Sequence, residues 1–140
     1  MIESTNIIYT QNMANNPIQK WHQVVQEKNF KLLSEILDES VTFFSPVVFH
    51  PQKGKEITLK YLSAVAILFN VESFTYTHEL ITENMASLEF ELELDGVYIN
   101  GLDLITWNDE QKIIEFKVFI RPLQGINKLH DFMGIALKKS

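Results

Sequence analysis

Two apolar runs joined by a short polar turn decide the fold of this chain. VYINGLDLITW (residues 97–107) is followed by NDEQ (108–111) and then by KIIEFKVFIRP (112–122). Both runs are rich in β-branched and aromatic residues, and the polar link between them is typical of a hairpin loop. We therefore expect two adjacent antiparallel strands, with a single acid, Asp103, inside the first of them.

Asp103 is the first candidate for a functional group. An acid in an apolar segment costs free energy unless it is paired, and an unpaired one commonly stays protonated because its pKa rises. Two interpretations stay open: a catalytic or ligand-contacting acid, and a structural carboxyl that is satisfied by Trp21 or Tyr61 or is turned to the rim of the pocket. The expected apolar surroundings of Asp103 are Ile105, Trp107, Phe116 and Val118.

The segment before this hairpin has the two-residue period of strands. Phe74, Tyr76 and His78 alternate with polar residues, and LEFELEL (88–94) alternates apolar residues with glutamate. Asp95-Gly96 separates this run from the next and predicts a two-residue type I′ turn. The result is a series of long antiparallel strands, one of which has an acidic outer face.

Helical patterns occupy most of the remaining chain. Pro17 is a favourable helix start, Asn29 can cap a second short helix, and apolar stripes predict helices over 55–69 and 123–138. VTFFSP (41–46) predicts a short strand that leads into a proline-rich loop carrying His50.

Helices beside one long antiparallel sheet indicate an α+β fold. Long strands twist and curl, so we expect a cone-shaped, strongly curved sheet with the N-terminal helices on its concave face and a C-terminal helix. The concave space is the expected site of a small-molecule pocket. We expect residues 1–16 to be a leader and residues 17–140 to form a single domain.

Composition excludes several classes of function. The net charge of −6 and the scattered lysines argue against nucleic-acid binding. The absence of cysteine removes disulfides, thiolate catalysis and Cys-ligated zinc, and the four histidines lack metal-ligand spacing, so we expect no metal and no cofactor. No apolar run reaches the length of a membrane span, and we expect a cytoplasmic protein.

The order of these elements resembles the SnoaL-like branch of the nuclear transport factor 2-like superfamily, which includes the ketosteroid isomerases. The resemblance covers residues 17–122 and rests on the order and spacing of Ser45-Pro46, the Pro/Gly loop, Asp103, Trp107-Asn108 and Lys112-Ile113. It implies a cone-shaped α+β fold, a frequent homodimer through the outer face of the sheet, and activities that range from isomerase and cyclase to non-catalytic binding.

Of the three isomerase site residues compared with this sequence, only one is matched. The position of its general base falls on Ser45, which is not a base near neutral pH, and its oxyanion-hole tyrosine falls on Trp21, whose N–H is a donor but not an acid. Its oxyanion-hole aspartate matches Asp103. In cyclases of this fold, as the resemblance implies, one pocket aspartate acts as acid and base. The Asp-Arg-Asp arrangement of the epoxide hydrolases is not matched, because Arg121 is the only arginine.

The expected pocket therefore combines residues from several elements. His50 is expected at its mouth. His78 shares a face with Phe74 and Tyr76 and is a candidate to reach the cavity, with a surface or satisfied core position as the alternative. The complete expected pocket set is Trp21, Ser45, His50, Tyr61, His78, Ile105, Trp107, Phe116, Val118 and Ile120.

Phe119 and Arg121 alternate with this set and are expected on the outer face of the sheet. An apolar residue among charges there predicts a homodimer interface, although Arg121 can instead serve as an anion clamp.

Two hypotheses follow. The first is a cofactor-independent isomerase or cyclase-like enzyme that uses Asp103 as acid and base on a small hydrophobic molecule. The second is a non-catalytic binding or accessory domain of the same fold.

Overall fold

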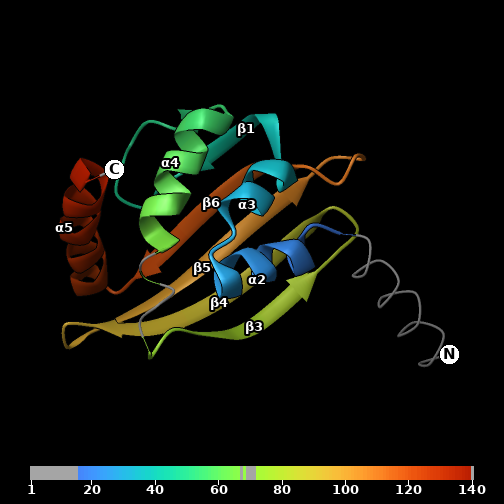
Figure 1. The fold of residues 1–140 in the computed structure, drawn as a ribbon. Helices are drawn as coiled ribbons and strands as arrows, with labels where there is room; N and C mark the ends of the chain where they lie inside the picture. The colour runs from blue at the N-terminus through green and yellow to red at the C-terminus, as the bar shows by residue number, and fades with distance from the viewer. Residues whose placement is uncertain (1–15, 67, 69–71, 140) are drawn as a thin grey trace, which may run out of the picture.

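A computed structural model describes residues 16–66, 68 and 72–139, so residues 1–15 of the expected leader lie outside the described part. Its elements, in chain order, are α2 (Ile18–Glu27), α3 (Phe30–Ile36), β1 (Leu37–Phe44), β2 (Gln52–Lys53), α4 (Lys55–Val65), β3 (Thr75–Ile81), β4 (Met85–Leu94), β5 (Val97–Trp107), β6 (Ile113–Arg121) and α5 (Leu123–Lys139). Figure 1 shows their arrangement. The last residues of the helix expected over 55–69 are partly outside the described range.

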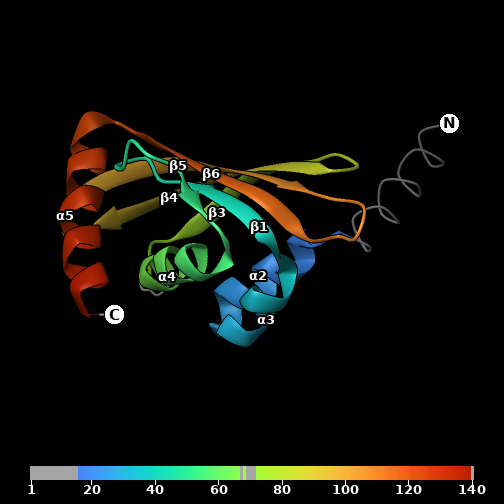
Figure 2. The same ribbon diagram turned by 90° about the horizontal axis from the view of Figure 1, so that it is seen from above.

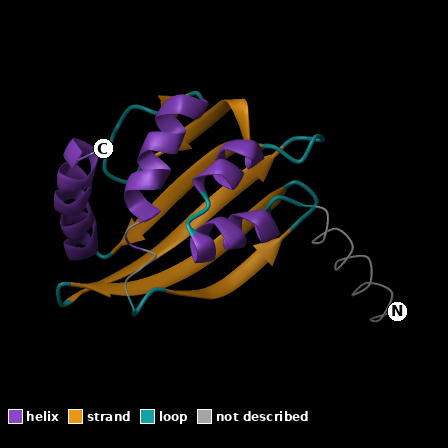
Figure 3. Cartoon of the chain, viewed as in Figure 1, coloured by secondary structure: helices purple, strands orange, loops and turns teal. Residues whose placement is uncertain are grey.

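One curved sheet forms the body of the fold, with strand order β2-β1-β6-β5-β4-β3. Every neighbouring pair is antiparallel except β1 and β6, which run parallel. Figure 2 shows α2, α3 and α4 on the same side of the sheet, with α5 across one end, and Figure 3 separates the helical layer from the strands. The expected α+β architecture is confirmed.

Local signals explain where the elements begin and turn. The Asn29 side chain accepts a hydrogen bond from the Leu32 amide at 3.0 Å, which caps α3 as expected. Asp95 and Gly96 both have positive φ, 50° and 81°, as the type I′ turn between β4 and β5 requires. At the next turn the Asn108 carboxamide oxygen accepts from the amides of Glu110 and Lys112.

The sheet departs from the sequence expectation in two places. β1 begins at Leu37, earlier than the expected residue 41, and pairs with the unexpected short strand β2. In β3 the register shifts between Tyr76 and His78, so that Tyr76 lies opposite Phe90 whereas His78 lies opposite Glu89. This bulge inserts Thr77 into the strand and reverses the face of every residue after it.

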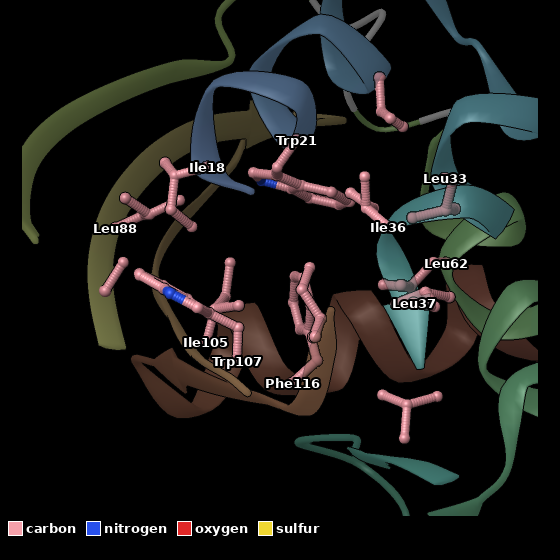
Figure 4. Close-up of a cluster of buried hydrophobic side chains, with 14 of the residues drawn as sticks. Ile18, Trp21, Leu33, Ile36, Leu37, Leu62, Leu88, Ile105, Trp107 and Phe116 are labelled. Carbon is pink, nitrogen blue, oxygen red and sulfur yellow. The ribbon is translucent and has the colours of Figure 1, made fainter. Parts of the chain in front are cut away.

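Two apolar clusters fill the space between sheet and helices. Figure 4 shows the first, in which Trp21 of α2 lies over Phe116 of β6 with ring centroids 5.0 Å apart. The second cluster joins α4 and α5 to the other end of β4 and β5 through Phe90, Ile99 and Met133. Tyr76 and Val118 pack against both clusters, and this is where the candidate site lies.

Candidate functional site

A narrow cavity of about 50 Å³ opens between the concave face of the sheet and the helices. A space of this size holds a few water molecules. Asp103 is the only ionisable side chain among the described residues that line it. The lining residues are Trp21, Phe43, Ser45, Pro46, Val47, Leu62, Val65, Leu68, Phe74, Phe90, Leu92, Ile99, Asp103, Phe116, Val118, Ile120, Leu129 and Met133.

Asp103 is buried because it occupies an inward position in the middle of β5. Its side chain is 5% exposed, and its strand neighbours are Leu88 of β4 and Val118 of β6. Burial raises the pKa of Asp103 to about 7, and a hydrogen bond from Tyr76 lowers it by a smaller amount. Near neutral pH the carboxyl is therefore present in both its neutral and its ionised form.

Tyr76 of β3 is the hydrogen-bond partner of Asp103. Its hydroxyl donates to Asp103 Oδ2 at 3.0 Å and accepts from Trp21 Nε1 at 3.0 Å. Burial, followed by the charge of Asp103, holds the pKa of Tyr76 well above its usual value, so this hydroxyl stays protonated. Among the described residues, Asp103 Oδ1 makes no hydrogen bond.

Aromatic contacts hold Tyr76 in place. The rings of Phe74 and His22 meet the Tyr76 ring edge-on, each at a centroid distance of 5.2 Å, and Phe90 does so at 6.2 Å. The Phe90 ring lies across Gly101, where an added Cβ would stand 2.2 Å from the Phe90 Cζ atom. The absence of a side chain at Gly101 thus lets an aromatic wall form beside Asp103.

The structure brings together some of the expected pocket residues. Trp21, Ser45, Phe116, Val118 and Ile120 line the cavity with Asp103. The Ser45 hydroxyl accepts from the Val47 amide at 3.2 Å. Ser45 thus shapes the loop beside the cavity.

Other expected pocket residues lie elsewhere. Ile105 and Trp107 lie further along β5 than the cavity; they are buried in the first cluster and do not line the cavity. Tyr61 packs against both clusters and does not line the cavity either. His50 is exposed on its loop and outside the cavity lining.

The expectation for His78 is wrong. The bulge turns its ring to the outer face, where the side chain is 78% exposed and contacts Glu89 Oε1 at 3.1 Å. The same bulge explains why Tyr76 points inward and His78 does not.

Sequence reasoning expected Trp21 or Tyr61 to satisfy Asp103, and the partner is Tyr76, two strands away. Two strand spacings are about 10 Å, a separation that only a long side chain can span. The alternation of β3, which predicts an inward side chain for Tyr76, was the sequence signal that could have identified this partner. Trp21 takes part indirectly, since its indole N–H contacts Tyr76 and not the acid.

On the outer face of the sheet, a row of polar side chains crosses four strands. His78 of β3 contacts Glu89 of β4, whose other oxygen accepts from Asn100 Nδ2 of β5 at 3.0 Å. Arg121 of β6 donates to Asn100 Oδ1 at 3.4 Å. Phe119 is 48% exposed on the same face, as expected from alternation.

Metal and membrane sites have no support in the described part of the chain. No group of three or more histidine, cysteine or acidic side chains is placed to hold a metal ion. Among the described helices, none combines the length and the hydropathy needed to cross a lipid bilayer.

Comparisons with known proteins give the fold a context. No protein-family model matches the sequence, nor does any curated protein. Among solved structures, a steroid delta-isomerase from Pseudomonas aeruginosa is similar with a TM-score of 0.81 and 25% identity, over 91% of this chain and 93% of the other. A protein with a cystatin-like fold from Silicibacter pomeroyi gives 0.80 and 27% identity, over 91% and 88% of the two chains.

More distant structures share the fold alone. An NTF2-like protein from Mesorhizobium loti has a TM-score of 0.68 at 17% identity and covers 80% of this chain and 93% of its own. The epoxide hydrolase/cyclase-like enzyme SalBIII, which acts in pyran ring formation in the polyether salinomycin, has a TM-score of 0.60 at 17% identity, over 81% and 92%.

Proposed function

We propose, from the premise that this chain is a member of the NTF2-like superfamily in its SnoaL-like, ketosteroid isomerase-like form, that it acts on a small apolar molecule without a cofactor. In this proposal Asp103 is the acid and base of an isomerase or cyclase-like reaction. The observation that carries it is a single buried carboxyl, with a pKa of about 7, on the wall of an otherwise apolar cavity.

The chemistry follows from that pKa. A group that titrates near the working pH both donates and accepts protons at useful rates, which is the requirement for general acid–base catalysis. Because the described cavity lining contains no cation, an anionic ligand has no counter-charge there. The proposed substrate is therefore neutral and largely apolar.

The cavity must widen to admit a ligand. A cavity of about 50 Å³ is smaller than the usual range of ligand pockets, about 300–1,000 Å³. Met133 and Leu129 of α5 close one side of it. Methionine adapts its shape readily, so we expect α5 to yield when a ring-sized molecule enters.

The second candidate is a binding protein of the same fold without catalysis. It is favoured by Ser45 and Trp21, which stand where the resemblance expects a base and an acidic hydroxyl. With these two replaced, Asp103 must take and return the proton alone, and hydrogen bonding to a ligand is the simpler use of one carboxyl.

Exchange of the carbon-bound hydrogens of a ketone probe for deuterium separates the two candidate functions. Native mass spectrometry of the purified protein first identifies any co-purified molecule, and simple cyclic ketones in D₂O serve as carbon-acid probes. The enzyme proposal predicts that the protein accelerates deuterium uptake next to the carbonyl and that Asp103→Asn abolishes the acceleration. Saturable binding without exchange would instead establish the binding protein.

The outer face of the sheet is proposed as the interface of a homodimer. Leu80, Tyr98 and Phe119 are exposed on it. Acidic residues project from β4 on one side of β5, and Lys117 and Arg121 project from β6 on the other side. A two-fold axis along β5 places the acids of one copy opposite the cations of the other.

Light scattering after gel filtration at micromolar concentration tests the dimer. The wild type is expected at twice the monomer mass and Arg121→Glu as a monomer. Lys20→Glu, the same charge change on the exposed side of α2, is expected to stay dimeric. A monomeric wild type overturns the proposal.

A cytoplasmic location remains part of the proposed function, to be tested by cell fractionation.

A further inference from the structure

Strand β5 has one inward position without a side chain, Gly101, in the middle of the cavity floor, which is the inward face of β4, β5 and β6. The inward residues on either side of it, Ile99 and Asp103, are buried and line the cavity. Successive inward residues of a strand lie about 6.6 Å apart, which is twice the rise per residue. The floor from Ile99 to Asp103 is therefore about 13 Å long, with Gly101 at its centre.

The ring of Phe90 occupies the space that Gly101 leaves open. Phe90 lies opposite Gly101 on β4, is 7% exposed, and lines the cavity where Gly101 does not. Its Cζ, Cε2 and Cε1 atoms lie 2.2, 2.4 and 2.6 Å from the point at which a Cβ of residue 101 would stand. The outer end of the ring thus reaches over β5, and a side chain from the neighbouring strand fills the centre of the floor.

The neighbours of Phe90 hold the ring in this position. Phe74 of β3 stacks on it, with ring centroids 5.5 Å apart and ring planes at 25°, and Tyr76 meets it edge-on at 6.2 Å. Ile120, opposite Gly101 on β6, lines the cavity on the other side. The ring can leave the floor only if these packed side chains move.

The Phe90 ring stands between the two ends of the cavity. Trp21 and Asp103 line the end at the first apolar cluster, and Ile99 and Met133 line the end at α5. One six-membered ring is about as long as the step of about 6.6 Å between successive inward residues. A ligand with a second fused ring that is seated at the Asp103 end therefore has to lie over Phe90.

We propose that Phe90, seated over Gly101, is the specificity-determining residue of the cavity, and that it restricts the ligand to a molecule with a single ring and excludes fused polycyclic molecules. The proposal rests on the proposed function, because the cavity must be the ligand site. It adds the number of rings that the ligand has, and it is independent of which ligand group meets Asp103.

Movement of α5 does not remove this restriction. Leu129 and Met133 close the cavity from α5, whereas Phe90 belongs to the sheet. The pairing of β4 with β5 is continuous from Met85 to Leu94, so backbone hydrogen bonds fix the strand on both sides of Phe90. A displaced α5 enlarges the end of the cavity and leaves the ring at its centre.

Two probes that differ by one fused ring test the proposal. Benzyl alcohol has one ring, and 2-naphthylmethanol has two rings and the same hydroxymethyl group. Burial of apolar surface alone would make the two-ring probe the tighter ligand. In NMR titrations the wild type is instead expected to bind the one-ring probe more tightly, by about fivefold or more, the low end of the cost of overpacking a filled site.

Three variants locate the restriction at Phe90. Phe90→Ala opens the floor and is expected to reverse the preference, so that the two-ring probe binds about tenfold more tightly than the one-ring probe. In Phe90→Ala/Gly101→Leu the new side chain begins where the ring ended, and the wild-type preference should return. Ile105→Ala, the control, removes a buried apolar side chain from the same face of β5 outside the cavity and should keep the wild-type preference.

Phe90→Leu covers the case in which Phe90→Ala fails to fold, and it should shift the preference in the same direction by a smaller factor. A second measurement needs no ligand. Gly101→Ala is expected to lower the urea midpoint of the wild type but not that of Phe90→Ala or Phe90→Leu, because the ring atoms that the methyl group would strike are gone. An equal loss in all backgrounds would mean that the ring does not fill the space at Gly101.

The outcomes separate this inference from the proposed function. If the probes bind and the Phe90 variants keep the wild-type preference, Phe90 does not set the number of rings, although the cavity still binds small apolar molecules. A wild type that binds the two-ring probe more tightly overturns the inference in the same way. If no variant binds either probe, the proposed function fails and the specificity role fails with it.

Discussion

Two tyrosine–carboxylate pairs occupy opposite faces of the same sheet. On the concave face the Tyr76 hydroxyl donates to Asp103 at 3.0 Å, and on the outer face the Tyr98 hydroxyl donates to Glu91 at 2.6 Å. The chemistry of the two bonds is the same, and the outer one is shorter. Their surroundings differ, because Asp103 is 5% exposed whereas Tyr98 is 46% exposed.

The difference teaches that burial of the carboxyl, and not the length of its hydrogen bond, is what raises the pKa of Asp103. The pKa of Tyr98 is raised chiefly by its bond to Glu91, while the pKa values of Tyr76 and Asp103 are raised chiefly by desolvation. Water around the outer pair solvates the charge and screens it. In the inner pair, burial brings the pKa of the Asp103 carboxyl to about 7, so this group changes its protonation near neutral pH.

The largest expected effect comes from Asp103→Asn, measured as stability against pH. The pKa of Asp103 is about 7 in the folded chain, against an ordinary value of 3.8 for the unfolded chain. Between these values the folded state keeps a proton that the unfolded state releases, so wild-type stability falls as pH rises and levels off above pH 7. The variant has no such loss, so its stability relative to the wild type should rise by about 4 kcal/mol between pH 4 and pH 8.

Urea unfolding at both pH values measures this change. Ser87→Asn introduces the same side chain at an outward position of β4 without removing a titratable group, so its difference from the wild type should not depend on pH. If the free energy of unfolding of Asp103→Asn and of the wild type changed equally with pH, the pKa of Asp103 would not be raised in the folded chain.

Removing the inner hydroxyl should cost more than removing the outer one. Tyr76→Phe removes both hydrogen bonds of the Tyr76 hydroxyl and leaves Asp103 Oδ2 without its donor in a buried site, which is expected to destabilise the fold by about 1–3 kcal/mol. Tyr98→Phe is expected to change the unfolding midpoint little, because water replaces the lost bond. Equal losses in the two variants would remove the distinction between the faces.

A pair of glycine substitutions probes the aromatic wall of the cavity. Gly101→Ala pushes a methyl group into the Phe90 ring and is expected to destabilise by about 1–3 kcal/mol, reduced to the extent that the ring can turn. Gly134→Ala meets nothing within 4 Å in α5 and should stabilise by about 1 kcal/mol. Thermal unfolding of both variants checks the opposite signs, and a stabilising Gly101→Ala would contradict the described packing.

The sequence pattern predicted most of the architecture, because each element has strong local signals. The alternation in LEFELEL, the Asp95-Gly96 turn and the Asn29 cap act over a few residues, and all three appear where expected. The burial of Asp103 followed from the same alternation, since Ile99, Ile105 and Trp107 on the same face of β5 are buried as well.

The partners of Asp103 could not be predicted in the same way. One inserted residue, Thr77, decides that Tyr76 faces the cavity and His78 faces outward, and no local preference marks that bulge. The bond between Trp21 and Tyr76 depends on how α2 lies against β3, a contact between residues 55 positions apart. Register and helix docking are set by the packing of the whole core and leave little trace in a local pattern.

The titration of Asp103 itself tests the central claim most directly. In protein labelled with ¹³C at the aspartate side-chain carboxyl, assigned by comparison with Asp103→Asn, its resonance is expected to titrate with a pKa of about 7. A midpoint near the ordinary value of 3.8 would mean that the carboxyl is solvated and ionised at neutral pH. In that case Asp103 would have no proton to donate into the cavity.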